Sequence, residues 1–175
     1  LNSMGQVIVS EGTLQADGTI KGHVDLRARG ILAGKGTVGS LSLEGALNYA
    51  EGIIRPTGTL SIASSLSISR PVFIAIDTDR TSLLHVGGDL TVAADVTFVI
   101  SPQELAEGEY RLITFTGAFS GNMGHFLVQG LTGLSYQIEQ REQAIVLVVN
   151  KQRGAAEGVK WTGAVSGAWD YQTEN

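Results

Sequence analysis

The residues best suited to bind a metal ion are two aspartates that alternate around a threonine, Asp77 and Asp79. Carboxylates on a loop are the ligands that Ca²⁺ prefers. The surrounding residues match neither the D-x-D-x-D-G loop nor the glycine-rich repeat that mark known calcium sites. Arg80 follows at once and can neutralise the pair. We therefore expect a solvated turn here, with Asp77 and Asp79 as the only metal candidates.

The three histidines, His23, His85 and His125, lie far apart, without the i, i+4 spacing of a helical zinc site. His85 alternates with Leu84 and Val86, so we expect it to face outward from a strand. The sequence thus predicts neither a metal site nor a catalytic role for these side chains.

Carbohydrate-cleaving enzymes need two carboxylates on one face, one acting as acid and the other as base or nucleophile. Six aspartates could stack in adjacent coils of a winding chain: Asp17, Asp25, Asp77, Asp79, Asp89 and Asp95. None lies in a phrase that combines acidic and aromatic residues, so we expect no enzymatic activity. A glycan lyase or hydrolase fragment remains the alternative.

The phrase Gly34-Lys35-Gly36-Thr37 superficially resembles a phosphate-binding loop. It lacks the G-x-x-x-x-G-K-[ST] spacing, and no helical pattern follows it. The chain has no cysteine, which excludes disulfides and thiolate ligands. We expect no cofactor and no catalytic residue.

Composition narrows the possible partners. The formal net charge is −5, and nucleic-acid binding needs clustered Lys and Arg, so we expect no nucleic-acid partner. No run of 18 apolar residues occurs, so we expect no membrane insertion by this segment. The 175 residues include 23 Gly and only 3 Pro, which favours strands broken by tight turns.

Apolar residues alternate in short groups from residue 6 to residue 100, with a turn every six to ten residues. Period two indicates strands, which we expect to be three to five residues long. A Gly-Thr-apolar phrase recurs at Gly12, Gly18, Gly36 and Gly58 and predicts a corner followed by an inward side chain. The predicted core consists of these aliphatic residues: Leu41, Leu43, Leu60, Ile62, Leu66, Ile68, Ile74, Ile76, Leu84, Val86, Leu90 and Val92.

Two all-β architectures fit many short strands: a sandwich and a solenoid. We favour a solenoid with coils of roughly 20 residues, stacked about 4.8 Å apart. A β-sandwich binding module of a secreted repeat protein is the alternative. We expect residues 1–4 to be a remnant of expression, 5–100 to form solenoid coils, 101–150 a hairpin-rich capping region, and 151–175 a linker and the start of a next repeat. Within the capping region, a polar turn at residues 140–143 separates two strand patterns, 134–139 and 144–149, which predicts a β-hairpin.

Several phrases, in order, resemble passenger segments of bacterial autotransporters and autotransporter-associated β-strand repeat proteins. Gly34 to Gly39 resembles the family's G-x-G-T start, and Gly52 to Leu60 its turn, with Thr57 where Gly is usual. Gly108 to Ile113 resembles a G-x-y-x-l-i strand. Trp161-Thr162-Gly163 with Trp169-Asp170 resembles a boundary between repeats.

The resemblance implies a right-handed parallel β-helix with a C-terminal β-hairpin cap similar to an autochaperone region. It implies export across a bacterial outer membrane, extracellular display on the cell surface, and a structural or adhesive role in virulence-type proteins. Partners would be neighbouring repeats of the same chain, and a host surface or glycan bound through other parts of the parent protein. It transfers no catalytic residue.

Overall fold

The protein is all-β. The computed structural model describes residues 5–44, 54–77, 83–101, 105–131 and 133–151, and within these ranges it contains fifteen strands, one 3-10 turn and no α-helix. The first ten strands are β1 (Gln6–Ala16), β2 (Thr19–Gly34), β3 (Thr37–Glu44), β4 (Ile54–Pro56), β5 (Thr59–Ile62), β6 (Leu66–Ile68), β7 (Val72–Asp77), β8 (Leu83–Val86), β9 (Leu90–Val92) and β10 (Val96–Ser101). The remaining elements are β11 (Gly108–Phe115), β12 (Phe119–Gly121), the 3-10 turn η1 (Met123–His125), β13 (Phe126–Gln129), β14 (Leu134–Arg141) and β15 (Ala144–Lys151).

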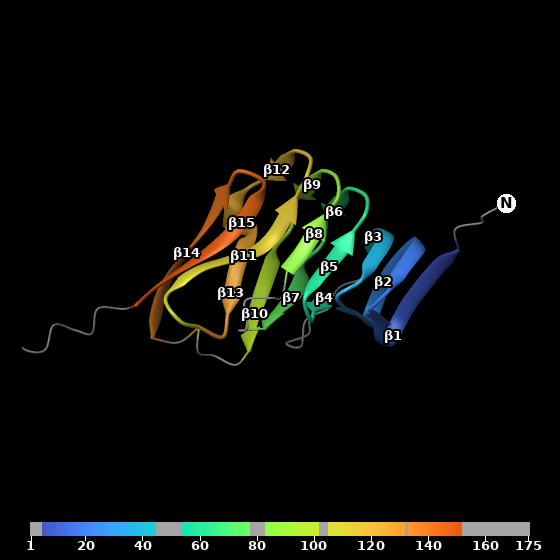
Figure 1. Cartoon of the computed structure of the whole chain (residues 1–175), viewed down its shortest axis with the longest axis horizontal. Coiled ribbons are helices and arrows are strands. Elements are labelled where there is room, and N and C mark those ends of the chain that lie inside the picture. Colours follow the sequence, from blue (N-terminus) through green and yellow to red (C-terminus); the bar gives the residue numbers. More distant parts are fainter. Residues whose placement is uncertain (1–4, 45–53, 78–82, 102–104, 132, 152–175) are drawn as a thin grey trace, which may run out of the picture.

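Strands lie side by side along the long axis of the molecule, from β1 at one end to β14 at the other (Figure 1). Every pairing found between the described strands β1 to β10 is parallel. A sandwich of antiparallel neighbours would not pair in this way.

The distance along the chain between paired residues increases towards the C-terminus. In the first pair of strands, Gln6 lies opposite His23. Further along, Ser67 lies opposite Thr91, and Thr91 in turn lies opposite Ser120, so each of these steps spans more of the chain than the one before. The expected spacing of roughly 20 residues therefore does not hold along the whole chain, because the connections between strands lengthen.

The strands form two sheets. One has twelve strands, in the order β13-β10-β7-β4-β2-β3-β5-β8-β11-β15-β14, with β1 paired to β2; the other contains β12, β9 and β6. The large sheet is mixed, because β15 pairs antiparallel with both β11 and β14. The antiparallel pair β14–β15 turns at Glu142 and Gln143, inside the polar segment where the sequence predicted a hairpin turn.

The first strands are longer than the sequence pattern predicts. We expected three to five residues, whereas β1 has 11 and β2 has 16. The register between them shifts by one residue between Val9 and Glu11, opposite Ala28, which has a φ of 44°. An extra residue of this kind bends a strand without ending its ladder, so β2 continues through a corner where the pattern predicts a break.

The interior is a continuous apolar core. All twelve residues of the predicted core are buried, with at most 6% of each exposed. Parallel pairing places aliphatic side chains of neighbouring strands beside one another: Leu60 lies next to Leu84, which lies next to Ile113. Burial of each such side chain contributes roughly 1.5–3 kcal/mol to folding.

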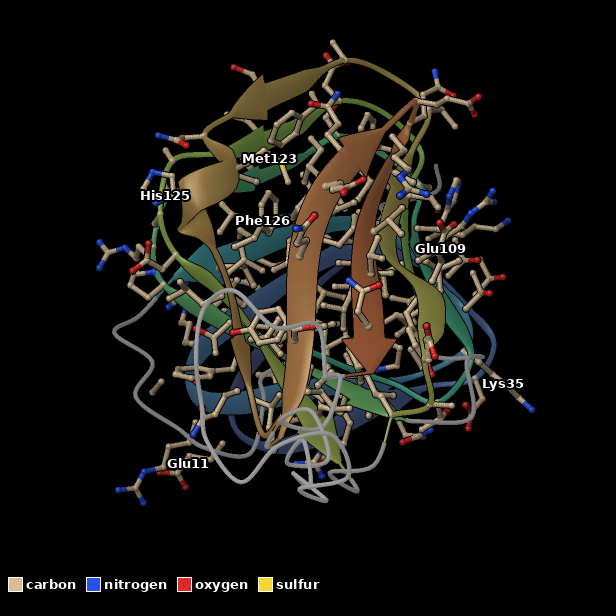
Figure 2. All side chains as sticks on the ribbon, turned by 90° about the vertical axis from the view of Figure 1, so that its left-hand side faces the viewer. Glu11, Lys35, Glu109, Met123, His125 and Phe126 are labelled. Atoms are coloured by element: carbon tan, nitrogen blue, oxygen red, sulfur yellow. The ribbon has the colours of Figure 1, made fainter. Side chains whose placement is uncertain are left out.

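The hairpin β14–β15 crosses the C-terminal end of the core (Figure 2). Ile145, Leu147 and Val149 of β15 are buried in that core, and Leu134 and Ile138 of β14 pack against it while partly exposed. Residues 152–175 lie outside the described residues, as do residues 1–4, so the predictions of a linker, a next repeat and an expression remnant stay predictions.

Candidate functional site

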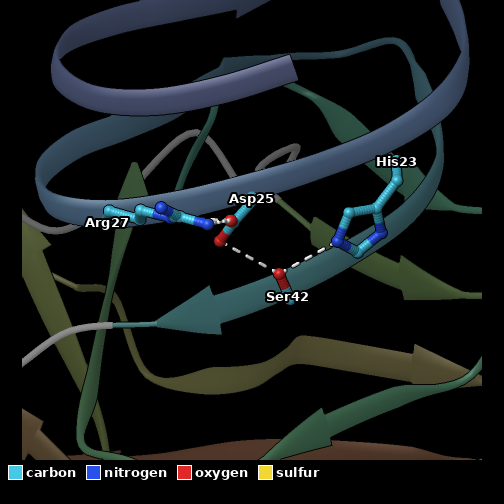
Figure 3. Close-up of polar contacts among 4 residues, drawn as sticks. All are labelled: His23, Asp25, Arg27 and Ser42. Carbon is cyan, nitrogen blue, oxygen red and sulfur yellow. Dashed lines mark hydrogen bonds and ion pairs between the residues drawn. The ribbon is translucent and has the colours of Figure 1, made fainter. Parts of the chain in front are cut away.

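The most elaborate polar cluster in the described part of the chain is centred on Asp25. Parallel pairing sets Asp25 of β2 beside Ser42 of β3. Asp25 is only 2% exposed, and it is the one charged side chain buried among the described residues. Its carboxylate accepts hydrogen bonds from Arg27 Nε at 2.7 Å and from Ser42 Oγ at 3.1 Å (Figure 3).

The electrostatics of the cluster keep Asp25 ionised. The hydrogen bond from Arg27 lowers the pKa of the Asp25 carboxyl, and that from Ser42 acts in the same direction, while burial opposes them. A second guanidinium nitrogen of Arg27 completes an ion pair with the same carboxylate oxygen. A buried carboxylate of this kind is tolerated because it is paired and hydrogen-bonded.

His23 completes the cluster. Its Nδ1 lies 2.8 Å from Ser40 Oγ and its Nε2 lies 3.0 Å from Ser42 Oγ. The single proton of the Ser42 hydroxyl is donated to Asp25, so Nε2 of His23 must donate to Ser42 Oγ. In neutral His23, Nδ1 then accepts from Ser40.

Asp25, His23 and Ser42 are the residue types of a hydrolase triad, but their order differs. In a triad the histidine accepts the serine proton and the carboxylate holds the histidine. Here the serine lies between the other two and gives its proton to a carboxylate whose pKa is lowered. The arrangement therefore binds two strands together and does not activate Ser42 as a nucleophile.

An open depression of about 590 Å³ lies beside this cluster. His23 and Ser40 line it, together with Lys21 and Ser64. Asp25 and Ser42 are not among its lining residues, so the ionised carboxylate is held away from the depression. Only the edge of the cluster faces a space that a ligand could enter.

A larger open depression, of about 990 Å³, lies between β8, β11 and the β14–β15 hairpin. Its rim carries Arg141, which pairs with Glu109 and with Glu139. The hydrogen bond to Glu109, followed by that to Glu139, raises the pKa of Arg141. His85 also lines it, with Nδ1 2.9 Å from Thr114 Oγ1. Arg141 thus ties β14 of the hairpin to Glu109 of β11.

The residues considered as metal ligands or catalytic groups from the sequence lie at separate places in the structure. Asp77 ends β7, opposite Ser101, and its partner candidate Asp79 lies outside the described residues. His125 Nδ1 lies 2.9 Å from Asp95 Oδ1 at an exposed corner. With the contacts of His23 and His85 given above, the three histidines have three different sets of partners.

The described aspartates do not stack on one another. Asp17 is exposed and accepts from Gln15 Nε2 at 3.0 Å. Asp89 Oδ1 accepts from the Ala118 amide at 2.8 Å, and Asp95 faces His125. Each carboxylate thus has neutral or basic neighbours, and the described residues contain no group of three or more potential metal ligands.

Sequence reasoning treated Asp25 as one of six stacking carboxylates and missed its buried network. A signal was present, because Asp25 lies between Val24 and Leu26, with Arg27 two residues beyond it. A charge inside an apolar run, with an opposite charge at i+2 on the same strand face, predicts a buried pair. Ser42 could not be found in this way, since it joins through register alone.

Comparison with known proteins adds no relative. No model of a protein family matches the chain, and no curated protein is significantly similar to it. In the part of the chain that is described, no helix is long and apolar enough to cross a membrane.

Proposed function

We propose that the chain is a right-handed parallel β-helix that acts as a rigid stalk or display scaffold in a large secreted or surface-displayed bacterial protein of autotransporter type. Its role is structural or adhesive, it catalyses no reaction, and it works outside the cell. The observation that carries the proposal is the parallel pairing of successive segments around one apolar interior.

The packing supports a mechanical role. Side-chain columns run from coil to coil, for example Ile62, Val86 and Phe115, and all three are buried. A second column joins Val72, Val96 and Phe126. Each coil thus buries its apolar face against its neighbours, and the stability of the stack grows with the number of coil–coil interfaces.

The polar contacts support the same role. Asp25, Arg27 and Ser42 join β2 to β3, and the Ser65 hydroxyl accepts from the Asp89 amide at 3.0 Å. These contacts tie one coil to the next. A glycan-cleaving β-helix would need two carboxylates free to act in a groove. At the larger depression, Glu109 and Glu139 are both tied to Arg141.

A pair of cysteines tests the proposed coil stacking. Ser67 and Thr91 are parallel partners in the three-stranded sheet, where neighbouring strands are about 4.8 Å apart. That separation falls within the range that a disulfide spans, so Ser67→Cys with Thr91→Cys should form a bond under mild oxidation. Ser67→Cys with Ala93→Cys is the matched control, because it is shifted by two residues and should stay reduced. Equal bonding in both variants would contradict the register.

Surface display tests the role. We would place the chain, with an epitope tag ahead of residue 1, before an outer-membrane translocator in a laboratory bacterium. The tag should be accessible to antibody on intact cells, and accessibility should fall for Leu60→Asp, which prevents coil stacking. A tag that stays inside, while an unrelated passenger is displayed, would refute the proposed role.

A further inference from the structure

β1 is an edge strand at the N-terminal end of the molecule (Figure 1). Within the described residues β1 pairs only with β2, so its other row of backbone groups has no partner strand. Ile8 on this strand is 51% exposed, the largest exposure of any big apolar residue described. The edge continues the same stacking surface that joins β1 to β2 and β2 to β3.

Glycines at the corners show how closely one coil approaches the next. A Cβ on Gly22 would collide with the carbonyl oxygen of Gly5, and one on Gly36 would collide with that of Gly18. Real Cβ atoms do not come so near to another heavy atom, so these two corners require glycine. The requirement arises from the carbonyl oxygen of the preceding coil.

The first coil carries glycine at the equivalent corners, where nothing requires it. By the register of the strands, Gly5 is the counterpart of Gly22, and Gly18 is the counterpart of Gly36. A Cβ on Gly5 or Gly18 would meet no atom within 4 Å, and neither residue has a positive φ. The space beside these glycines is where a preceding coil would place its carbonyl oxygens.

We infer that the edge of β1 is a docking surface for one more parallel coil, equal in length to the step from Gly5 to Gly22 and with its corner carbonyls over Gly5 and Gly18. This inference rests on the proposed coil architecture. A second copy of the chain fits less well, because two β1 edges meeting head to head would run antiparallel and would not reproduce the corner spacing. The other end of the molecule presents the β14–β15 hairpin and no matching parallel coil.

The test inserts a second copy of residues 5–21 between residue 4 and Gly5. The added coil should raise the midpoint of thermal unfolding by at least about 4 °C and protect β1 amides from hydrogen exchange. The double substitution Gly5→Ala with Gly18→Ala, made in the original corner positions, should leave the unextended chain unchanged and abolish the gain in the extended chain.

Two results would overturn the inference: an extended chain without a gain, or a gain that the alanine pair leaves intact. Sedimentation of the unextended chain provides a further test, since a dimer that the alanine pair disrupts would make a second copy the occupant. The Ser67–Thr91 disulfide lies in the middle of the molecule and is independent of β1. If it forms while the extension fails, the docking surface is wrong and the proposed coil architecture is not.

Discussion

The two ends of this molecule differ in how the apolar core and its outermost strand are covered. At the C-terminal end, the β14–β15 hairpin crosses the core, and Leu147 is fully buried. At the N-terminal end, β1 has β2 as its only partner among the described strands, and Ile8 is half exposed. An exposed strand edge invites further pairing. The parallel ladder thus stops where an antiparallel hairpin joins the large sheet.

The cover depends on a change of strand direction. β11 pairs parallel with β8 on one side and antiparallel with β15 on the other. The chain reverses between β14 and β15, which pair antiparallel, so the parallel ladder does not continue beyond β11 on that side. No such reversal is found at β1, whose only described pairing is parallel.

The largest expected loss of stability comes from a charge placed in the interior, which we compare with a substitution in the exposed strand β1. Leu60→Asp and Ile62→Asp place an unpaired charge in the core, since both residues are fully buried. We expect each to cost at least about 4 kcal/mol of unfolding free energy, enough to prevent folding. Ile8→Asn is the control and should change stability little, because Ile8 is half exposed and the new side chain adds no charge opposite Asp25. Urea denaturation measures all three, and wild-type stability of both core variants would remove the core assignment.

The next effect compares the two ends directly. Leu147→Ala leaves a cavity beneath the hairpin and should cost about 2–5 kcal/mol. Leu14→Ala in β1 removes the same atoms from a half-buried side chain, so we expect a loss below about 1.5 kcal/mol. Equal losses in denaturant titrations would mean that the two ends are packed alike.

A smaller loss of stability is expected when alanine replaces glycine at the corners between strands. Gly36→Ala forces a Cβ towards the carbonyl oxygen of Gly18, and overpacking of this kind costs about 1–3 kcal/mol. Gly18→Ala meets open space at the N-terminal end and should fall within about 0.5 kcal/mol of wild type. Differential scanning calorimetry on both variants checks the pair; a reversed order would contradict the close approach.

The smallest effect is pH-dependent and involves Asp25. Because its pKa is lowered in the folded protein, its ionised form stabilises folding above the unfolded pKa of about 3.9. That contribution is lost as the pH falls below this value and through the folded pKa. Asp25→Asn should cost about 1–2 kcal/mol at pH 7. Its stability should also fall less than that of wild type between pH 5 and 2.5, and parallel pH profiles would contradict the role of Asp25.

Some features of the fold follow from local pattern. Alternation of apolar residues around Leu60, Leu66 and Leu84 predicted inward side chains, and all three are buried. Predicting which side chains point inward needs only residues close in sequence, because successive side chains of a strand point to opposite faces. The polar turn between residues 139 and 144 likewise indicated a hairpin before any pairing was known.

Other features depend on contacts between distant residues. β2 continues as one strand through an extra residue at Ala28, and this bulge can be recognised only from the register of β2 with β1. Ser42 reaches Asp25 from the neighbouring strand β3, through register alone. The mixed character of the large sheet is set by the place where β15 joins β11.

The sequence by itself thus determined the strand class, the inward aliphatic positions and the glycine corners, because each depends on residues within a few positions. Tertiary structure alone decided the lengthening distance between partners, the buried Asp25 cluster and the contrast between a covered and an open end. Each of these arises from which strand lies beside which, and that choice is made by packing across the whole chain.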